Sequence, residues 1–236
     1  MIELRQITKV FREGPRAVPT LRGVDLRVEA GEFLAIMGPS GSGKSTLLHV
    51  MGGLEPPTSG SVWFQRRELT ALSDRERSIL RRTAIGFIFQ RFNLVPSLTA
   101  AENVALPLML GGMSRRESLA RAEAGLARFG LAGRATHFPD ELSGGEMQRT
   151  AIARALSTEP ALVLCDEPTG SLDSASGAEV LEVLRSLPEP GKRSVVMVTH
   201  DPQAAGRCDR LVTIRDGAIE QIEVLRSTHA CAAPHA

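Results

Sequence analysis

Neither sign of charge predominates in this chain. It has 28 lysine and arginine residues against 27 aspartate and glutamate residues, which gives a net charge of +1. Proteins that bind nucleic acid over a broad surface carry a clear basic excess, so we expect no nucleic-acid partner. Any phosphate that this chain binds is expected at a defined site and not over a surface.

Long apolar segments and paired cysteines are also missing. No uninterrupted apolar run reaches the ~20 residues that a membrane-spanning helix needs, and the N-terminus, Met1 to Arg5, has no apolar signal segment. The three cysteines, Cys165, Cys208 and Cys231, are odd in number and lack C-x-x-C spacing, which argues against a disulfide framework or a zinc site. We therefore expect a cytoplasmic protein with free thiols.

The hydrophobic pattern predicts an α/β fold with an inserted lobe. With 236 residues, 42% of them hydrophobic, the chain is long enough to bury a full core. Short alternating runs before residue 30 are typical of half-exposed antiparallel strands. Helical periodicity from about residue 91 to residue 156 predicts a helical lobe inserted into the core. The small, polar segment 227–236 is expected to be a disordered tail after a single domain spanning 1–226.

Three apolar runs, 33–37, 161–165 and 194–198, are typical of buried parallel strands. The other expected elements are a turn at 14–15, a helix at 44–52, strands at 61–64 and 84–89, an amphipathic crossover helix at 178–187 and a hairpin turn at 215–218.

A glycine-rich loop follows the strand expected at 33–37. It matches the Walker A pattern G-x-x-x-x-G-K-[ST], and a helical pattern opens after it. In that setting consecutive backbone N–H groups surround phosphate oxygens, and the helix dipole favours negative charge; a glycine-rich turn before an ordinary helix is the alternative. Lys44 is expected to reach the β- and γ-phosphates, and the Ser45 hydroxyl to hold Mg²⁺. The residues expected at the nucleotide are Gly38, Pro39, Ser40, Gly41, Ser42, Gly43, Lys44, Ser45 and Thr46.

Two adjacent carboxylates, Asp166 and Glu167, end the buried strand that begins at Ala161. Ligands of open parallel sheets bind beyond the carboxyl ends of the strands, which brings both acids beside the Walker A loop. We expect Asp166 to hold Mg²⁺ through its water shell, and Glu167 to orient and deprotonate the water that attacks the γ-phosphate. Standing alone, such a pair is as typical of a helix N-cap or a solvated turn.

His200 and Gln90 each come directly after a further expected strand. A histidine beside the γ-phosphate can donate to transition-state oxygens, although a lone histidine at a strand end is more often structural. Gln90 is interpreted as a neutral oxygen ligand or a water-orienting group; without this context it would be an ordinary surface glutamine. The sequence thus predicts Glu167, His200 and Gln90 as catalytic residues, and Ser45, Gln90 and Asp166 as metal ligands.

A second short string, Leu142-Ser143-Gly144-Gly145-Glu146, follows about a hundred residues after the Walker A loop. It precedes the helical run Met147 to Leu156, so Ser143, Gly144 and Gly145 are expected to form a second anion site at a helix N-terminus. One chain thus has two expected phosphate-binding surfaces and one Walker A loop.

These motifs together resemble those of the ATP-binding subunit of an ABC (ATP-binding cassette) transporter, over about Ile2 to Ile222. The string 142–146 resembles the family signature, which other Walker A enzymes such as small-molecule kinases and GTPases lack. The resemblance implies a P-loop NTPase (RecA-like) core with a parallel sheet, an N-terminal antiparallel β-subdomain and an inserted α-helical lobe. The ordered matches are the Walker A loop, Gln90, the signature, Asp166-Glu167, the D-loop Ser171-Leu172-Asp173 and His200.

The resemblance also implies how the site is completed. In the family, two subunits form a head-to-tail homodimer, in which the signature of one closes over the ATP held by the other, with Asp173 near the seam. ATP and Mg²⁺ are the implied cofactors, and an integral membrane permease subunit is the implied partner. The chain would then be a peripheral protein at the cytoplasmic face of the membrane. The aromatic ring that stacks on adenine, commonly tyrosine in the family, would be Phe11 in this tyrosine-free chain.

Within the family, the segments 86–94, 98–104 and 166–170 are similar to the macrolide-export (MacB) and lipoprotein-releasing (LolD) branch. The cell-division (FtsE) branch is close enough to keep a second hypothesis open, an ATP-driven regulator that relays a signal across the membrane without moving a substrate. The soluble ABC proteins of DNA repair or translation are disfavoured, because a long coiled-coil insertion, zinc motifs and a second cassette are all missing.

The segment after Gln90, Arg91 to Pro96, joins the core to the helical lobe and carries apolar side chains in an expected loop. Apolar groups exposed at such a hinge often mark a partner site. We expect a short cytoplasmic helix of a membrane subunit to dock in a groove beside it. The alternative is that Phe92 and Leu94 only pack the lobe against the core.

Overall fold

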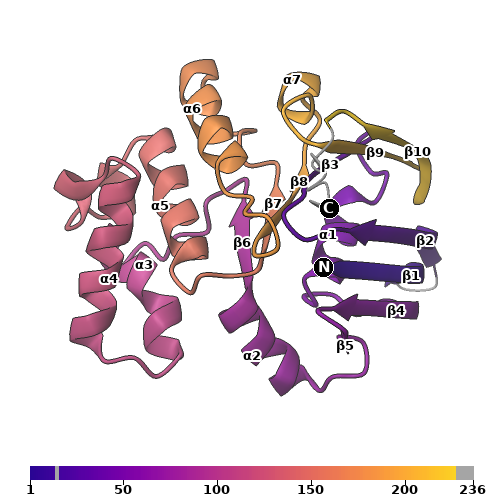
Figure 1. The fold of residues 1–236 in the computed structure, drawn as a ribbon, viewed down its shortest axis with the longest axis horizontal. Coiled ribbons are helices and arrows are strands. Elements are labelled where there is room, and N and C mark those ends of the chain that lie inside the picture. The colour runs from indigo at the N-terminus through magenta and orange to yellow at the C-terminus, as the bar shows by residue number, and fades with distance from the viewer. Residues whose placement is uncertain (14–15, 227–236) are drawn as a thin grey trace, which may run out of the picture.

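The computed structural model describes residues 1–13 and 16–226. The turn expected at 14–15, the tail expected at 227–236 and Cys231 lie outside the described residues. Among the described residues, no helix is both long enough and apolar enough to cross a membrane. Figure 1 shows a helical lobe at one end, a central sheet, and a group of antiparallel strands at the other end.

A six-stranded sheet in the order β10-β9-β3-β8-β7-β6 forms the centre of the molecule. Five of its strands run parallel, and β10 pairs antiparallel with β9 as the hairpin that the sequence predicted. The strands are β3 (Phe33–Met37), β6 (Ile85–Phe89), β7 (Leu162–Asp166), β8 (Ser194–Val198), β9 (Arg210–Arg215) and β10 (Ala218–Val224).

Alternate residues of the parallel strands face two different cores. Leu34 and Ile36 of β3 pack in the core that includes helix α1 (Lys44–Met51). Phe33 and Ala35 pack in the core on the other face, which includes α6 (Ser174–Arg185) and α7 (Pro202–Ala205). Because both faces are covered, these strands read as continuous apolar runs, which is why the sequence revealed them.

A second, antiparallel sheet in the order β2-β1-β4-β5 packs over α1 from the side opposite the central sheet. It confirms the half-exposed strands expected before residue 30. Ile2, Leu4 and Ile7 of β1 are fully buried in the core that also contains α1. The helix therefore lies between two sheets. The strands are β1 (Ile2–Glu13), β2 (Arg16–Val28), β4 (Ser59–Phe64) and β5 (Arg67–Glu68).

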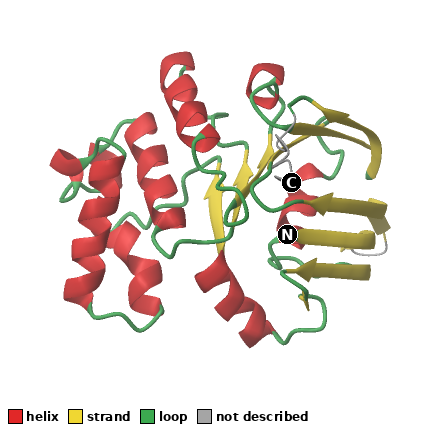
Figure 2. Ribbon diagram, in the orientation of Figure 1, coloured by secondary structure: helices red, strands yellow, loops and turns green. Residues whose placement is uncertain are grey.

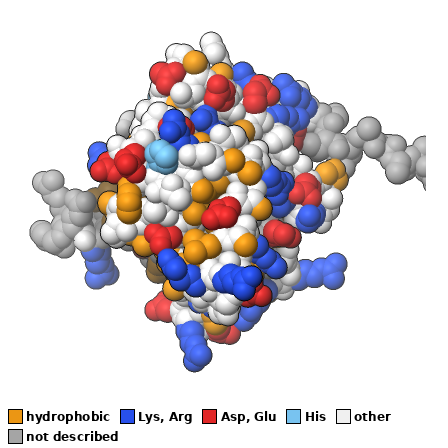
Figure 3. Space-filling model, turned by 90° about the vertical axis from the view of Figure 1, so that its left-hand side faces the viewer, with side chains coloured by type: hydrophobic (Ala, Val, Ile, Leu, Met, Phe, Trp, Pro, Cys, Tyr) orange, Lys and Arg blue, Asp and Glu red, His pale blue; other side chains and the backbone are white. Residues whose placement is uncertain are grey.

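The helical lobe consists of α3 (Ala100–Leu110), α4 (Arg115–Arg128) and α5 (Gly144–Leu156), with short 3₁₀ turns at Ala132–Arg134 and Pro139–Glu141. It has a small core of its own, and Figure 2 shows its helices gathered on one side of the central strands. On the outer face of the lobe, acidic and basic side chains are interspersed and not segregated by sign (Figure 3).

One long helix, α2 (Asp74–Ala84), was not predicted from the sequence. None of its residues is buried, and its only apolar residues are Ile79, Leu80 and Ala84, which are too few to stand out as helical periodicity in the sequence. Its start does carry a local signal, because Ser73 and Glu76 form a capping box of reciprocal side chain to backbone hydrogen bonds. The crossover helix α6 also begins earlier than expected, at Ser174, after the N-cap Asp173.

Candidate active site

The Walker A loop joins β3 to α1 and lines a cleft of about 470 Å³ at the carboxyl edge of the parallel strands. The loop depends on glycine at two positions. Gly38 has a φ of 154° and would place a Cβ 2.0 Å from the Ile214 carbonyl oxygen. Gly43 has a φ of 99° and would place one 2.6 Å from the Thr20 carbonyl oxygen. The residues that line the cleft are Thr20, Ser40, Gly41, Gly43, Lys44, Ser45, Thr46, Glu167 and His200.

Helix α1 leaves its N-terminal N–H groups without a side-chain cap. Its N-cap, Gly43, makes no capping hydrogen bond, whereas a Ser, Thr or Asp side chain caps each of the other helices of eight or more residues among the described elements. Free N–H groups at a helix N-terminus bind anions. The uncapped end opens into the cleft, where it fits a phosphate group.

Two hydrogen bonds hold the Lys44 side chain against the Walker A loop. The side chain is buried, and its ammonium group donates to the carbonyl oxygens of Gly38 and Pro39, both at 2.9 Å. These two bonds satisfy the buried charge in part and orient it toward the cleft that it lines. The Ser42 hydroxyl, also buried, has no hydrogen-bond partner among the described residues.

A hydrogen bond joins Ser45, which lines the cleft, to Asp166 at the end of β7. The Ser45 hydroxyl donates to Oδ1 of Asp166 at 2.9 Å, and His49, one turn further along α1, lies 3.8 Å from Oδ2. A hydroxyl and a carboxylate are hard oxygen donors of the kind that bind Mg²⁺. The donor set therefore fits a magnesium ion, with Asp166 half-buried at the end of β7.

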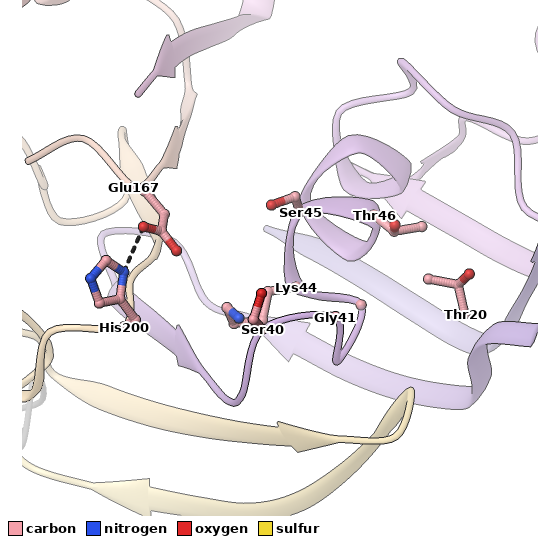
Figure 4. Close-up of a pocket in the computed structure, with 9 residues that line it drawn as sticks. Thr20, Ser40, Gly41, Lys44, Ser45, Thr46, Glu167 and His200 are labelled. Atoms are coloured by element: carbon pink, nitrogen blue, oxygen red, sulfur yellow. Dashed lines mark hydrogen bonds and ion pairs between the residues drawn. The ribbon is translucent and has the colours of Figure 1, made fainter. Parts of the chain in front are cut away.

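Glu167 and His200 form a pair across the cleft from α1. Nδ1 of His200 lies 2.6 Å from Oε2 of Glu167, and Figure 4 shows this pair facing Ser45 and the Walker A loop. Glu167 has a φ of 46°, in the left-handed region that residues other than glycine seldom adopt. The backbone turns sharply after β7 and aims the carboxylate into the cleft.

Gln90 lies close to the same carboxylate, just after β6. A Cβ built on Gly170 would sit 2.9 Å from Nε2 of Gln90 and 3.3 Å from Oε2 of Glu167, so both side chains approach this glycine. Gln90 is exposed and lies outside the described lining of the cleft. Its roles as metal ligand and water-orienting group stay predictions.

The signature lies apart from the cleft, on the helical lobe. Ser143 caps α5, with its hydroxyl accepting from the Glu146 N–H at 3.2 Å. Gly144 packs beside Leu172, and Gly145 beside Ser176, at the start of α6. Figure 1 shows α5 on the far side of β6 from α1. The start of α5 and the Walker A loop thus lie apart within one chain, and the second anion site expected at Ser143, Gly144 and Gly145 stays a prediction.

Phe11, expected to stack on adenine, lies on β1 with 36% of its surface exposed. The ammonium group of the buried Lys9 sits 4.8 Å from the centre of its ring, in a cation–π contact. Phe11 lies outside the described lining of the cleft, which on this side is Thr20 of β2. Its stacking role stays a prediction.

Two residues that the sequence analysis did not single out hold the segment after Gln90. Arg154 of α5 donates to the carbonyl oxygens of Phe92 and Asn93 at 2.8 and 2.5 Å, and desolvation lowers the pKa of its guanidinium. Asn103 of α3, fully buried, bonds the backbone of Val95 at 2.7 and 3.1 Å. The segment is thus attached to the lobe, and local sequence patterns carry no sign of the bonds from Arg154, which lies about 60 residues further along the chain.

The geometry of the site agrees with what comparison with known proteins shows. A family model described as ABC transporter matches residues 21–170. The chain belongs to the ABC transporter family. It is an ATP-binding cassette, an ATPase, of that family, and the fold class expected from the sequence is confirmed.

Relatives within the ABC transporter family include both names that the sequence resembled. A macrolide export ATP-binding/permease protein MacB from Marinobacter nauticus is 48% identical over 93% of this chain, which spans 34% of that protein. A lipoprotein-releasing system ATP-binding protein LolD from Shewanella denitrificans is 47% identical over 96% of this chain and 97% of its own length. This chain therefore spans about a third of the MacB relative and nearly all of LolD.

Solved structures of an archaeal cassette match the whole fold. Two dimeric structures of the cassette MJ0796 superpose with a TM-score of 0.89 and 44% identity, over 96% of this chain and 100% of theirs. One of them is described as a post-hydrolysis state bound to ADP and Pi. MJ0796 comes from Methanocaldococcus jannaschii.

The free thiols expected from the sequence are confirmed for Cys165 and Cys208, which are both buried and unpaired among the described residues. Burial raises the pKa of the Cys165 thiol and raises that of Cys208 to about 12. Neither thiol is therefore a nucleophile at neutral pH.

The lowered pKa of Glu146, in the signature, leads to a prediction about how the stability of the protein depends on pH. The Ser143 N–H, accepted at 2.8 Å, and the Arg134 guanidinium, also at 2.8 Å, hold the pKa of Glu146 at about 2. A folded-state pKa below the ordinary value of 4.5 stabilises the protein above about pH 4.5, and this stabilisation is lost as the pH falls toward about 2. We expect Glu146→Gln to lower the free energy of unfolding by about 1–2 kcal/mol at pH 7, measured by urea titration.

The difference between parent and Glu146→Gln should shrink between pH 5 and pH 3.5, because the unfolded parent takes up a proton at Glu146 near the ordinary pKa of 4.5 while the folded protein keeps this carboxylate ionised. Glu123→Gln, on the exposed face of α4, is the matched control and should follow the parent at every pH. A gap between parent and Glu146→Gln that stays constant down to pH 3.5 would contradict this account of the cap.

Proposed function

We propose that the chain drives a membrane permease by binding and hydrolysing ATP in a head-to-tail homodimer, for export or lipoprotein release. The observation that carries the proposal is the Glu167–His200 pair, 2.6 Å apart, which faces the Walker A loop across a cleft of about 470 Å³. The names of the relatives, macrolide export and lipoprotein release, favour transport work over the cell-division alternative.

Hydrolysis follows from what each side chain of the cleft can do. The uncapped start of α1 and the Lys44 ammonium group hold the β- and γ-phosphates of ATP. Glu167 accepts a proton from the attacking water, and His200 holds that carboxylate and donates to the developing charge on the γ-phosphate. Mg²⁺, held by Ser45, Asp166 and Gln90, would neutralise phosphate charge in the transition state.

The homodimer is supported by the distance between the two phosphate-binding surfaces of one chain. Ser143, Gly144 and Gly145 lie on the lobe, outside the described lining of the cleft. A second copy, turned head to tail, can bring its signature over the nucleotide of the first. MJ0796, a dimer with the same fold, gives the proposal a structural precedent.

The membrane subunit is proposed to dock in a groove of about 560 Å³ between α2, β6 and α3. The stacked rings of Phe87 and Phe89, with centroids 5.7 Å apart, form part of its lining, and Leu110 of α3 is 60% exposed at its side. Of the segment 91–96, Asn93 contributes to the lining; Phe92 and Leu94 are half-buried. The groove lies beside the segment, but the apolar side chains Phe92 and Leu94 of that segment are not part of its described lining.

Charge in this groove indicates the kind of segment that binds there. Arg81, Arg82 and Arg154 line the groove, and Nε of Arg82 is buried without a hydrogen-bond partner among the described residues. Exposed apolar side chains beside arginines fit an amphipathic helix that carries a carboxylate. We propose such a cytoplasmic helix of the permease as the occupant, which places this chain peripherally at the cytoplasmic face of the membrane.

We further propose that residues 1–226 form one ABC ATP-binding domain, with the helical lobe of about 91–156 inserted into it. The pairing of β6 with β7 supports this division, because these strands flank the lobe in the chain and lie side by side in the sheet. The lobe can then turn against the core at its two crossings without breaking the sheet.

Glu167→Gln tests the proposed hydrolysis. The substitution keeps the shape of the side chain but removes the base, so turnover should fall about 10²–10⁴-fold while ATP binding persists. Gel filtration with ATP and Mg²⁺ should then show a dimer that is absent without nucleotide. The matched control is Glu159→Gln, another glutamate with positive φ, outside the cleft, which should turn over like the parent. Turnover of Glu167→Gln within a few-fold of the parent would remove Glu167 from the mechanism.

Leu110→Glu tests the docking groove. A carboxylate at this exposed apolar position should repel the proposed acidic helix and weaken its binding to the groove. Leu110 lies outside the lining of the nucleotide cleft, so the substitution should leave the cleft unchanged. In fractionated cells the variant should leave the membrane pellet, and the purified protein should keep ATPase activity within two-fold of the parent. Val224→Glu on β10, 71% exposed and outside the groove, should stay with the membrane. A folded Leu110→Glu that sediments like the parent would refute docking at this site.

A further inference from the structure

The backbone at Glu167 needs support from its surroundings. Its φ of 46° is left-handed, and it precedes Pro168, whose ring pushes the preceding residue toward extended conformations. Strained residues of this kind persist where neighbouring groups hold them, and they gather at active sites. The contacts around Glu167 therefore decide where its carboxylate points.

Three contacts of Glu167 itself come from the core. Its N–H donates to the Val198 carbonyl at 2.9 Å, and its own carbonyl accepts from the Gly170 N–H at 3.1 Å. The carboxylate meets His200, as described above. These bonds attach Glu167 to the core formed by the central sheet.

A fourth contact comes from the helical lobe. Gln148 of α5 donates from Nε2 to the carbonyl oxygen of Pro168 at 2.6 Å. Both residues are buried, and Gln148 is fully so. The peptide between Pro168 and Thr169, one residue beyond the Glu167–Pro168 bond, is thus held by a side chain of the signature helix, which comes 20 residues earlier in the chain than Pro168.

Helix α5 connects this bond to the signature. Ser143 is its N-cap, and Gln148 lies five residues further on, about 7.5 Å along a helix with a rise of 1.5 Å per residue. A helix of this length moves as a rigid body, so a displacement of Ser143 is passed to Gln148. Arg154, six residues beyond Gln148, attaches the segment after Gln90 to the same helix.

We infer that Gln148 is a positioning residue, through which the signature helix sets the direction of the Glu167 carboxylate in its own subunit. The inference rests on the proposed function, in which Ser143 meets the nucleotide held by a second copy. Engagement of that nucleotide by α5 then fixes Glu167 in the subunit's own cleft. The two nucleotides of a dimer are coupled in this way within each chain.

Fold stability alone does not require a glutamine at this position. Oε1 of Gln148 is buried without a hydrogen-bond partner among the described residues, so the glutamine leaves one buried acceptor unpaired. Methionine has a similar length and no amide, and would leave the Pro168 carbonyl unpaired in its place. The number of unpaired acceptors is the same, so Gln148→Met tests the bond with little expected change in stability.

The experiment compares steady-state ATP hydrolysis and melting temperature of the full chain. Because a small misplacement of a catalytic group is costly, Gln148→Met should lower kcat about 10–100-fold and leave KM for ATP within about three-fold. The matched control is Thr150→Val, which removes another hydrogen bond of α5, donated by the fully buried Thr150 from Oγ1 to the Glu146 carbonyl at 2.8 Å. Its kcat should stay within two-fold of the parent.

A double mutant separates positioning from a general loss of structure. If Gln148 acts through Glu167, then Gln148→Met should change the slow single-turnover rate of the Glu167→Gln protein by less than two-fold. A merely structural role predicts the same fold-loss in both backgrounds and would overturn the inference. A Gln148→Met kcat within two-fold of the parent would also overturn it, and would leave the proposed function standing if Glu167→Gln is inactive.

Parent-like turnover of Glu167→Gln is a different result, because it would overturn the proposed function as well. If Gln148→Met does not fold, Gln148→Asn takes its place. Asparagine keeps the amide but is one methylene too short to reach the Pro168 carbonyl, and the same limits on kcat, KM and non-additivity apply.

Discussion

The register of three parallel strands is the constraint on which the site depends. Val198 of β8 is paired with Ile36 of β3 on one side and with Asp166 of β7 on the other. The residues that follow these positions, in the Walker A loop, at Glu167 and at His200, must therefore emerge at one edge of the sheet. A slip of one residue would turn each of these side chains to the opposite face. Burial of the strands on both faces is what prevents such a slip.

This edge of the sheet supplies only part of the proposed nucleotide site. The cleft receives the uncapped end of α1 and the Glu167–His200 pair, whereas the capped end of α5 lies across β6 on the lobe. Each chain can thus serve as the base of one nucleotide site and the cover of another. Because α5 also bonds the backbone after Glu167 and after Gln90, covering one site and arranging the next are tasks of a single rigid helix.

Sequence patterns predicted the parts of this structure that local chemistry defines. The Walker A loop, Asp166-Glu167 and His200 each follow a strand, and a strand buried on both faces is detectable as an apolar run. The helix α2 escaped detection because only three of its residues are apolar, and these pack against the core without being fully buried or are exposed. Arg154 and Gln148 escaped for another reason: their partners are backbone carbonyls, up to 62 residues away in the chain, and no residue type marks a carbonyl that needs a donor.

The central claim, that the signature of one chain completes the nucleotide site of another, can be measured by mixing two inactive variants. Lys44→Ala disables the Walker A loop, and Ser143→Asp keeps an N-cap while setting a negative charge against phosphate. Each homodimer lacks an intact composite site, but a mixed dimer has one. ATP hydrolysis by an equal mixture should rise well above that of either variant, toward about a quarter of the parent rate. A mixture no more active than its separate components would contradict the account.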